Sequence, residues 1–249
     1  ASMIHVRAGL ADGSGMMKDA MPTLKPVEIE ARQSIFRGES GFLRFAGSRP
    51  VDLRLEHTLL ALGERLVDGD VGLMNARNSS ETRLELNHVT VLAHGGLVKL
   101  TNDMAATSSM PVRIDCFDSI LAGRDSVAMI EQTGSDSYEI LKGQLSWSAD
   151  RCFYDGFATL WRLQGTGALQ EYNFSRWKSH WVGQEFQTAA RPAGWARLPL
   201  PVGRAMHTYR TPDFELLFLD SPAIGAASDE LDLGANLEEL PPLPDTRAP

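Results

Sequence analysis

The chain repeats a short phrase in which apolar and polar residues alternate. Clear copies begin at residues 27, 51, 82 and 112, and a weaker fifth copy runs from Leu141 to Ser148. Alternation with a period of two is typical of strands with one buried face. Repetition at this spacing indicates a stacked architecture. The pattern therefore predicts that equivalent strands from successive repeats lie side by side.

A second strand is predicted in each repeat, after a loop rich in Gly, Asp, Asn and Ser. These strands are Phe42–Phe45, Val71–Met74, Leu97–Leu100, Val127–Ile130 and Thr159–Arg162. No helical pattern of 10 to 15 residues lies between the strands, which argues against a βαβ sheet. We therefore predict an all-β fold in which each repeat forms one rung of a parallel β-helix, with rungs about 4.8 Å apart.

Stacking at this register places one polar side chain per repeat on a single line near a turn. The line consists of Gln33, His57, His88, Asp118 and Trp147. Two imidazoles and a carboxylate are able to ligate a transition metal or form an acid/base site. The alternative is a hydrogen-bonded polar ladder, which we favour because a straight line of residues does not surround a metal. We expect Ser34, Thr58 and Ser119 to satisfy backbone groups at this turn.

The repeat pattern ends near Gly165. Leu169, Phe174, Trp177 and Trp181 follow at near-helical spacing, which predicts a short amphipathic helix or an irregular flap that caps the stack. The last strand-like run is Phe214–Leu219. We predict an N-terminal strand and loop over residues 1–25, coils over 26–165, an aromatic cap with closing strands over 166–240, and a Pro-rich tail over 241–249.

The five tryptophans all lie in the C-terminal half of the chain, at positions 147, 161, 177, 181 and 195. Buried tryptophans would plug the end of the core, and exposed ones would stack on sugar rings. We expect Trp147 and Trp161 to plug the core. Both alternatives stay open for Trp177 and Trp181, which with His57, His88 and Asp118 are the candidate ligand-binding residues.

Composition excludes several classes of function. The formal net charge of −8 argues against binding of nucleic acid or of an anionic membrane. No apolar run reaches the length of a membrane span, and no signal peptide is visible. Because the chain opens with strand-like residues, we expect a mature or excised piece, with any export signal upstream.

Other candidate chemistry is weak. Cys116 and Cys152 sit at different points of their repeats, so stacking does not by itself bring them together. A disulfide between them is one alternative, and a buried thiol in the fourth coil is the state that we favour. Echoes of hydrolase motifs at His94–Gly96, Asn102–Asp103 and Arg176–Lys178 lack the paired aspartates. Asp115, Asp118, Asp150 and Asp155 are interpreted as solvated carboxylates and not as a calcium site. No catalytic residue, metal ligand or cofactor is predicted.

Two C-terminal phrases carry a family resemblance. Asp220–Ala227 and Asp232–Ala235 resemble the Ser-Pro-Ala-Ile … Asp-Ile-Gly-Ala closing motif of bacterial right-handed parallel β-helix proteins, with Gly225 and Leu233 as departures. The phrases Leu86–Val91 and Gly143–Asp150 resemble planctomycete β-helix segments. The resemblance covers residues 26 to 240 and implies a right-handed, pectate-lyase-like solenoid. That superfamily includes lyases, hydrolases, adhesins and inert scaffolds, so it assigns no reaction.

The resemblance implies an extracytoplasmic protein, and the residues favour a non-catalytic module. We expect it to bind a polysaccharide or a cell-surface protein, or to act as a scaffold or sensor in a larger chain. One alternative is a divergent polysaccharide lyase or glycoside hydrolase, which needs a groove where carboxylates or an arginine converge. Another is the extracellular C-terminal region of a membrane-anchored serine/threonine kinase.

Overall fold

A computed structural model describes most of the chain. The described residues are 2–7, 25–46, 49–73, 81–102, 108–124, 126–196, 204–218 and 220–242. The loop expected within residues 8–24, the loop at 75–80 and most of the predicted tail, residues 243–249, lie outside them. The described part is mostly β-structure, as predicted, and its helices are short.

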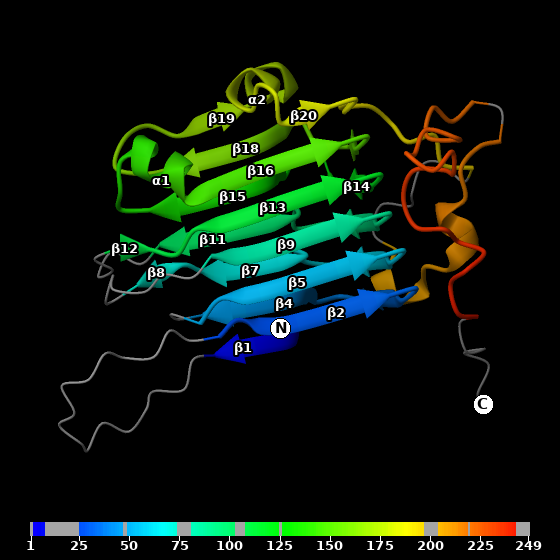
Figure 1. The fold of residues 1–249 in the computed structure, drawn as a ribbon, viewed down its shortest axis with the longest axis horizontal. Coiled ribbons are helices and arrows are strands. Elements are labelled where there is room, and N and C mark those ends of the chain that lie inside the picture. Colours follow the sequence, from blue (N-terminus) through cyan, green and yellow to red (C-terminus); the bar gives the residue numbers. More distant parts are fainter. Residues whose placement is uncertain are drawn as a thin grey trace.

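Five successive repeats each supply one strand to each of three sheets, and the strands stack in chain order (Figure 1). The three strands of each repeat are, in order, β2 (Val27–Arg32), β3 (Ile35–Gly38) and β4 (Gly41–Ala46); β5 (Val51–Glu56), β6 (Leu59–Leu62) and β7 (Val67–Asp70); β9 (Thr82–Asn87), β10 (Thr90–Ala93) and β11 (Val98–Asn102); β13 (Val112–Phe117), β14 (Ile120–Ala122) and β15 (Ala128–Gly134); β16 (Leu145–Asp150), β17 (Phe153–Asp155) and β18 (Thr159–Gln164).

The remaining elements lie outside these repeats. They are β1 (Ser2–Arg7), β8 (Gly72–Leu73), β12 (Ser108–Ser109), β19 (Gln170–Tyr172), β20 (Glu185–Phe186), the α-helices α1 (Tyr138–Gln144) and α2 (Phe174–His180), and the 3-10 helices η2 (Met206–Thr208) and η3 (Thr211–Phe214). Strands β8 and β12 pair antiparallel with each other, and β19 pairs antiparallel with β18.

The three sheets are named here by their strands. Sheet A has the order β1-β4-β7-β11-β15-β18-β19, sheet B has β2-β5-β9-β13-β16-β20, and sheet C has β17-β14-β10-β6-β3. Within sheet B the strands pair parallel and in register, so that Ile29, Leu53, Leu84, Ile114 and Trp147 are successive partners. The predicted register of the first four repeats is confirmed.

The predicted register of the fifth repeat is wrong by four residues. Leu141, the predicted partner of Val112, lies in helix α1, and Val112 pairs with Leu145 instead. A shift by an even number of residues leaves the same side chains facing inward, so alternation alone does not distinguish the two registers. Leu141 is still fully buried, but it reaches the core from the helix. As a consequence, Arg151 and not Trp147 follows Asp118 on the polar line.

Two other predicted strands are also displaced. In the second repeat the strand that joins sheet A is β7, which ends before Val71. Of the run predicted at 71–74, only Gly72–Leu73 is a strand, and it pairs with β12. Met74 lies outside the described residues. The run predicted at 214–219 begins at the end of η3 and contributes only an isolated bridge between Trp195 and Leu216, with Leu219 outside the described residues.

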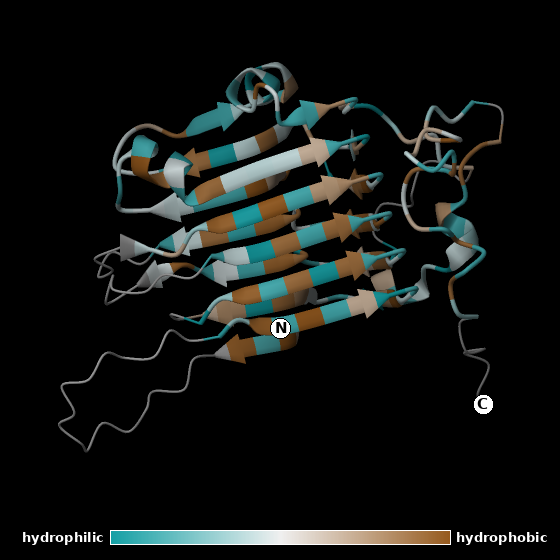
Figure 2. Ribbon diagram, viewed as in Figure 1, coloured by the Kyte–Doolittle hydropathy of each residue, from teal (hydrophilic) through white to brown (hydrophobic). Residues whose placement is uncertain are grey.

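The residues that the structure describes form two apolar cores. The first lies between the three sheets and is lined by the inward residues of every repeat, which gives the banded colouring of the strands in Figure 2. The second lies on the outer face of sheet C, where the C-terminal residues pack on Leu59, Leu92 and Ile120. Because both faces are covered, all the residues of β6, β10 and β14 are buried.

The C-terminal part of the chain has two different positions. Helix α2 lies at the end of the stack next to β18, so the short helix is the alternative present between residues 166 and 200 (Figure 1). The chain then passes alongside sheet C, drawn orange to red, instead of continuing to close the end. Arg37 donates to the carbonyl of Tyr209 (2.5 Å), and Glu39 Oε1 accepts from the amide of Met206 (2.5 Å). The segment therefore returns as far as the first repeat.

Candidate functional site: the polar column and the groove beside it

Each strand of sheet B is followed by one residue in the left-handed conformation. These residues, which we call the polar column, are Gln33 (φ 45°), His57 (φ 44°), His88 (φ 49°), Asp118 (φ 47°), Arg151 (φ 51°) and Gln187 (φ 49°). The chain turns sharply here to enter sheet C. Left-handed backbone costs a non-glycine residue roughly 1–2 kcal/mol, and His and Asp tolerate it better than most residues. The left-handed backbone at these positions therefore favours polar residues such as His and Asp in the column.

Hydroxyl groups satisfy the backbone at the same turn. Ser34, Thr58 and Ser119 each donate to the carbonyl two residues earlier, at 2.7, 2.8 and 2.6 Å. The expected role of these three residues is confirmed. In the fifth repeat the equivalent position is Cys152, whose Sγ lies 3.4 Å from the carbonyl oxygen of Asp150.

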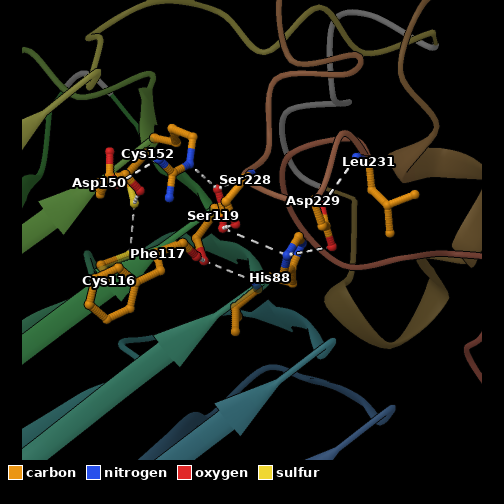
Figure 3. Close-up of polar contacts among 12 residues, drawn as sticks. His88, Cys116, Phe117, Ser119, Asp150, Cys152, Ser228, Asp229 and Leu231 are labelled. Carbon is orange, nitrogen blue, oxygen red and sulfur yellow. Dashed lines mark hydrogen bonds and ion pairs between the residues drawn. The ribbon is translucent and has the colours of Figure 1, made fainter.

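The two histidines of the column form a stacked pair. The ring centroids of His57 and His88 are 4.7 Å apart with an interplanar angle of 18°. His88 Nε2 lies 3.3 Å from Asp229 Oδ2 and 3.7 Å from Asp118 Oδ2, and its side chain is almost fully buried. Figure 3 shows His88 facing Asp229 of the C-terminal segment. The histidine thus links the third repeat to residues distant in sequence.

Asp118 is the centre of this contact. Its carboxylate accepts hydrogen bonds from the backbone amide of Ser228 (2.9 Å), the hydroxyl of Ser228 (2.6 Å) and Nε of Arg151 (2.6 Å). Burial by itself raises the pKa of Asp118, but the hydrogen bonds from Ser228 and Arg151 outweigh it and hold the pKa below its usual value. Asp118 is therefore the anion that holds the C-terminal segment.

Gly234 and Ala235 supply the other half of the contact. The amide of Gly234 donates to the carbonyl of Asp118 (2.8 Å), and the amide of Ala235 donates to Thr90 Oγ1 (2.9 Å). Gly234 has a φ of 89°, and a Cβ on it would clash with Thr90 Oγ1. At the far end Gln33 donates to Glu239 Oε2 (2.8 Å). These contacts therefore dock the segment on the turn between sheets B and C.

This arrangement bears on the two alternatives for the polar line. Both oxygens of Asp118 are used in hydrogen bonds, and His57 and His88 face each other instead of a common point. In the part of the chain that the structure describes, no group of three His, Cys, Asp or Glu side chains is arranged to hold a metal. Along the column His57 stacks on His88 and Arg151 donates to Asp118, and residues of the C-terminal segment contact His88 and Asp118.

The other two candidate ligand-binding residues are in the aromatic cap. Trp177 is fully buried and Trp181 is 8% exposed. Trp177 packs edge-on against Trp147 and Trp161, with ring centroids 5.2 and 5.9 Å apart. A tryptophan without an exposed face offers no surface for sugar stacking, so these residues pack as the plug. The structure does not bring them near His57, His88 or Asp118.

A buried glutamate organises the plug. Glu185 accepts hydrogen bonds from the indole nitrogens of Trp147 (2.5 Å) and Trp177 (2.7 Å), from the Tyr154 hydroxyl (2.8 Å) and from the Thr188 hydroxyl (2.5 Å). Glu185 is not among the residues predicted from the sequence. Buried indoles need acceptors, and Glu185 is the acidic residue that follows the tryptophan pair, which is the available signal.

Beside the polar column lies a groove that sequence analysis also missed. It encloses about 670 Å³ between sheet C, η3 and the C-terminal segment, and His88 forms part of its wall. Its apolar lining includes Trp195, Leu231 and Phe218, of which Phe218 is 80% exposed. The available signal is that β6, β10 and β14 are almost entirely apolar. Such runs indicate a strand that is covered on both faces, so a second layer was to be expected on sheet C.

The groove is acidic. Its described lining contains the carboxylates of Glu215, Glu230, Asp232 and Glu238 and no Lys or Arg. Carboxylates that line a partly apolar cleft produce a negative potential which attracts cations. The groove therefore suits a ligand that is both apolar and positively charged.

Comparisons with known proteins found no match among protein-family models, among curated proteins or among solved structures. Neither helix in the described ranges is long and apolar enough to cross a membrane.

Proposed function

We propose that this chain is a right-handed parallel β-helix of the pectate-lyase-like type that serves as a non-catalytic, extracytoplasmic binding module. Five in-register repeats that each give one strand to three parallel sheets support the architecture. Right-handedness is the general rule for connections between parallel strands of one sheet.

A structural role for the polar column supports the non-catalytic part of the proposal. His88 and Asp118 are 5% and 3% exposed, and their polar atoms face the C-terminal segment. A catalytic acid or base needs access to a substrate proton within hydrogen-bond reach. The column residues are instead occupied in holding the molecule together.

The groove carries the binding part of the proposal. We assign it an apolar segment of a partner protein that bears Lys or Arg side chains. Apolar side chains such as Phe218 supply contact area, and the four carboxylates select positive charge. The same charge argues against a polyuronate lyase, because a polyuronate is itself a polyanion and would be repelled.

Binding of synthetic peptides tests this assignment. A labelled peptide of alternating Leu and Lys is titrated against the protein by fluorescence anisotropy, with a Leu/Glu peptide, polygalacturonate and a neutral cello-oligosaccharide as competing arms. We expect saturable binding of the Lys peptide alone. Each exposed ion pair is worth about 0.2–1 kcal/mol, so the double variant Glu230→Gln with Glu238→Gln is expected to weaken binding by roughly twofold to thirtyfold.

Matched variants keep the test specific. Phe218→Ala removes an exposed apolar side chain inside the groove, and Val182→Ala removes one of similar exposure (79%) outside it. Glu28→Gln, on the outer face of sheet B, is the charge control. We expect only the groove variants to weaken binding. Equal loss in the controls, or preference for either saccharide, would contradict the proposal.

A further inference from the structure

The two cysteines lie against each other although their repeat positions differ. Both Cys116 and Cys152 are free thiols and fully buried, and their Sγ atoms are 3.2 Å apart (Figure 3). This corrects the expectation that stacking would not bring them together. Cys116 is on β13, and Cys152 follows the left-handed turn at Arg151, in the next repeat.

The turn explains the contact. The side chain that follows a column residue points back toward the preceding repeat. In the second repeat the same geometry places Thr58 Oγ1 3.3 Å from the carbonyl oxygen of Ala31. Ala31 pairs with Leu55, as Cys116 pairs with Ala149, so Thr58 and Cys152 hold the same offset from the strand below. The approach of the two sulfurs is therefore built into the repeat.

We propose that Cys116 and Cys152 form a disulfide between the fourth and fifth repeats, made while the chain folds in contact with a small-molecule disulfide such as oxidised glutathione. A covalent S–S bond is 2.03–2.05 Å long, so the sulfurs need to close by about 1.2 Å. The inference rests on this geometry and holds whether or not the groove binds a peptide.

The exchange is balanced in two steps. One cysteine thiolate attacks oxidised glutathione, which forms a mixed disulfide and releases one glutathione thiolate. The second cysteine thiolate attacks the cysteine sulfur of that mixed disulfide and releases the second glutathione thiolate. The two cysteines lose two electrons, glutathione disulfide gains them, and the two cysteine protons end on the released thiolates or in water.

Burial restricts this chemistry to the folding chain. Only the thiolate attacks a disulfide, and burial, together with the neighbouring Cys116, raises the pKa of the Cys152 thiol well above its usual value. Neither sulfur is accessible to glutathione in the folded protein. The oxidation state reached during folding is therefore retained afterwards.

Refolding under two redox conditions tests the proposal. The full chain is unfolded in urea with reductant and refolded either with a mixture of oxidised and reduced glutathione or with reduced glutathione alone. Each product is then unfolded, alkylated and examined by peptide mass spectrometry. We expect the first product to take up no alkyl group and to yield a cross-linked peptide pair, and the second to take up two alkyl groups.

A third sample shows whether burial locks the state. Oxidised glutathione is added to the protein already folded under reducing conditions, and we expect both thiols to remain alkylatable on later unfolding. The oxidised product should also unfold at a higher urea concentration than the reduced one, because the bond closes a loop of 36 residues.

Each variant introduces a residue type that other repeats carry at the equivalent position. Cys152→Ser places serine where Ser34 and Ser119 stand, and Cys116→Ala places alanine where Ala31 and Ala149 stand, so both variants are expected to fold. In each variant the urea midpoint should not depend on the refolding condition. Two free thiols after oxidative refolding, or glutathione attached to each cysteine separately, would overturn the proposal.

Discussion

At the scale of single residues, positions in the polar column must adopt a left-handed backbone and also supply a side chain that binds the C-terminal segment. Asp118 adopts a left-handed conformation that glycine would adopt without strain. Glycine would lack the carboxylate that accepts hydrogen bonds from Ser228 and Arg151. The sequence indicated the column from its polar residues, but nothing local in it identified the partners, because Ser228 is 110 residues away in the chain.

Asp118→Asn is expected to destabilise the protein at neutral pH. The amide keeps the shape of the side chain but loses the charge-assisted bonds and turns a donor toward Ser228, which costs about 1–3 kcal/mol. Urea unfolding measures the change. Asp115→Asn is the control, since its exposed pair with Arg113 contributes less than about 1 kcal/mol. Equal effects of the two variants would show that Asp118 does not hold the segment.

The same residue predicts a pH dependence. The pKa of Asp118 is lower in the folded protein than in the unfolded chain, where it is about 3.9. Its contribution is therefore fully present above that unfolded value and is lost as the pH falls through the folded pKa. We expect the difference in urea midpoint between the wild-type protein and Asp118→Asn to be constant near neutral pH and to close in acid. A difference that grows on acidification would contradict the assignment.

Glu185→Gln is expected to destabilise the aromatic plug. Four side-chain donors meet the carboxylate, and an amide offers one acceptor oxygen and an NH2 group that faces donors. The expected loss is on the order of 2–4 kcal/mol, measured by urea unfolding with tryptophan fluorescence. Glu171→Gln, which changes an exposed pair with Arg162, should cost less than about 1 kcal/mol. Similar losses would refute the hub role of Glu185.

At the scale of elements, alternation predicted the strands of sheet B well and their partners only partly. The three registers among the first four copies were correct because each copy begins with the same apolar-polar phase. The register of the fifth copy failed because Leu141 and Leu145 share that phase. Leu141 lies in α1, so Leu145 takes the place in the strand. The strand predicted over 214–219 failed because apolar residues such as Phe214 are buried in the second core without strand pairing.

Gly234→Ala tests the docking of the closing motif. The added Cβ meets Thr90, and the left-handed φ is unfavourable for alanine, so we expect the segment over residues 220–242 to loosen and to become sensitive to limited proteolysis. Gly143→Ala is the matched control in α1. No atom lies within 4 Å of its added Cβ, and it should leave stability unchanged or raise it by up to about 1 kcal/mol. Equal proteolysis of both variants would contradict the docking.

At the scale of the whole molecule, the separation of two cores makes a further prediction. Ending the chain after Pro192 removes Trp195 and the rest of the layer on sheet C but leaves the core between the sheets intact. We expect the β signal in far-UV circular dichroism to persist. The bared face of β6, β10 and β14 should bind the dye ANS and promote self-association. Loss of the β signal would show that the stack depends on its outer layer.

The sequence by itself determined the strand periodicity, the stacked repeats, the line of polar residues and the point near Gly165 where the repeats end. These properties are local, because each segment carries its own apolar phase and turn residues. The tertiary structure decided the fifth register, the position of the C-terminal segment, the groove and the contact of Cys116 with Cys152. Each of these depends on packing between segments that are far apart in the sequence. The alternation of apolar and polar residues along one segment carries no information about which other segment it packs against.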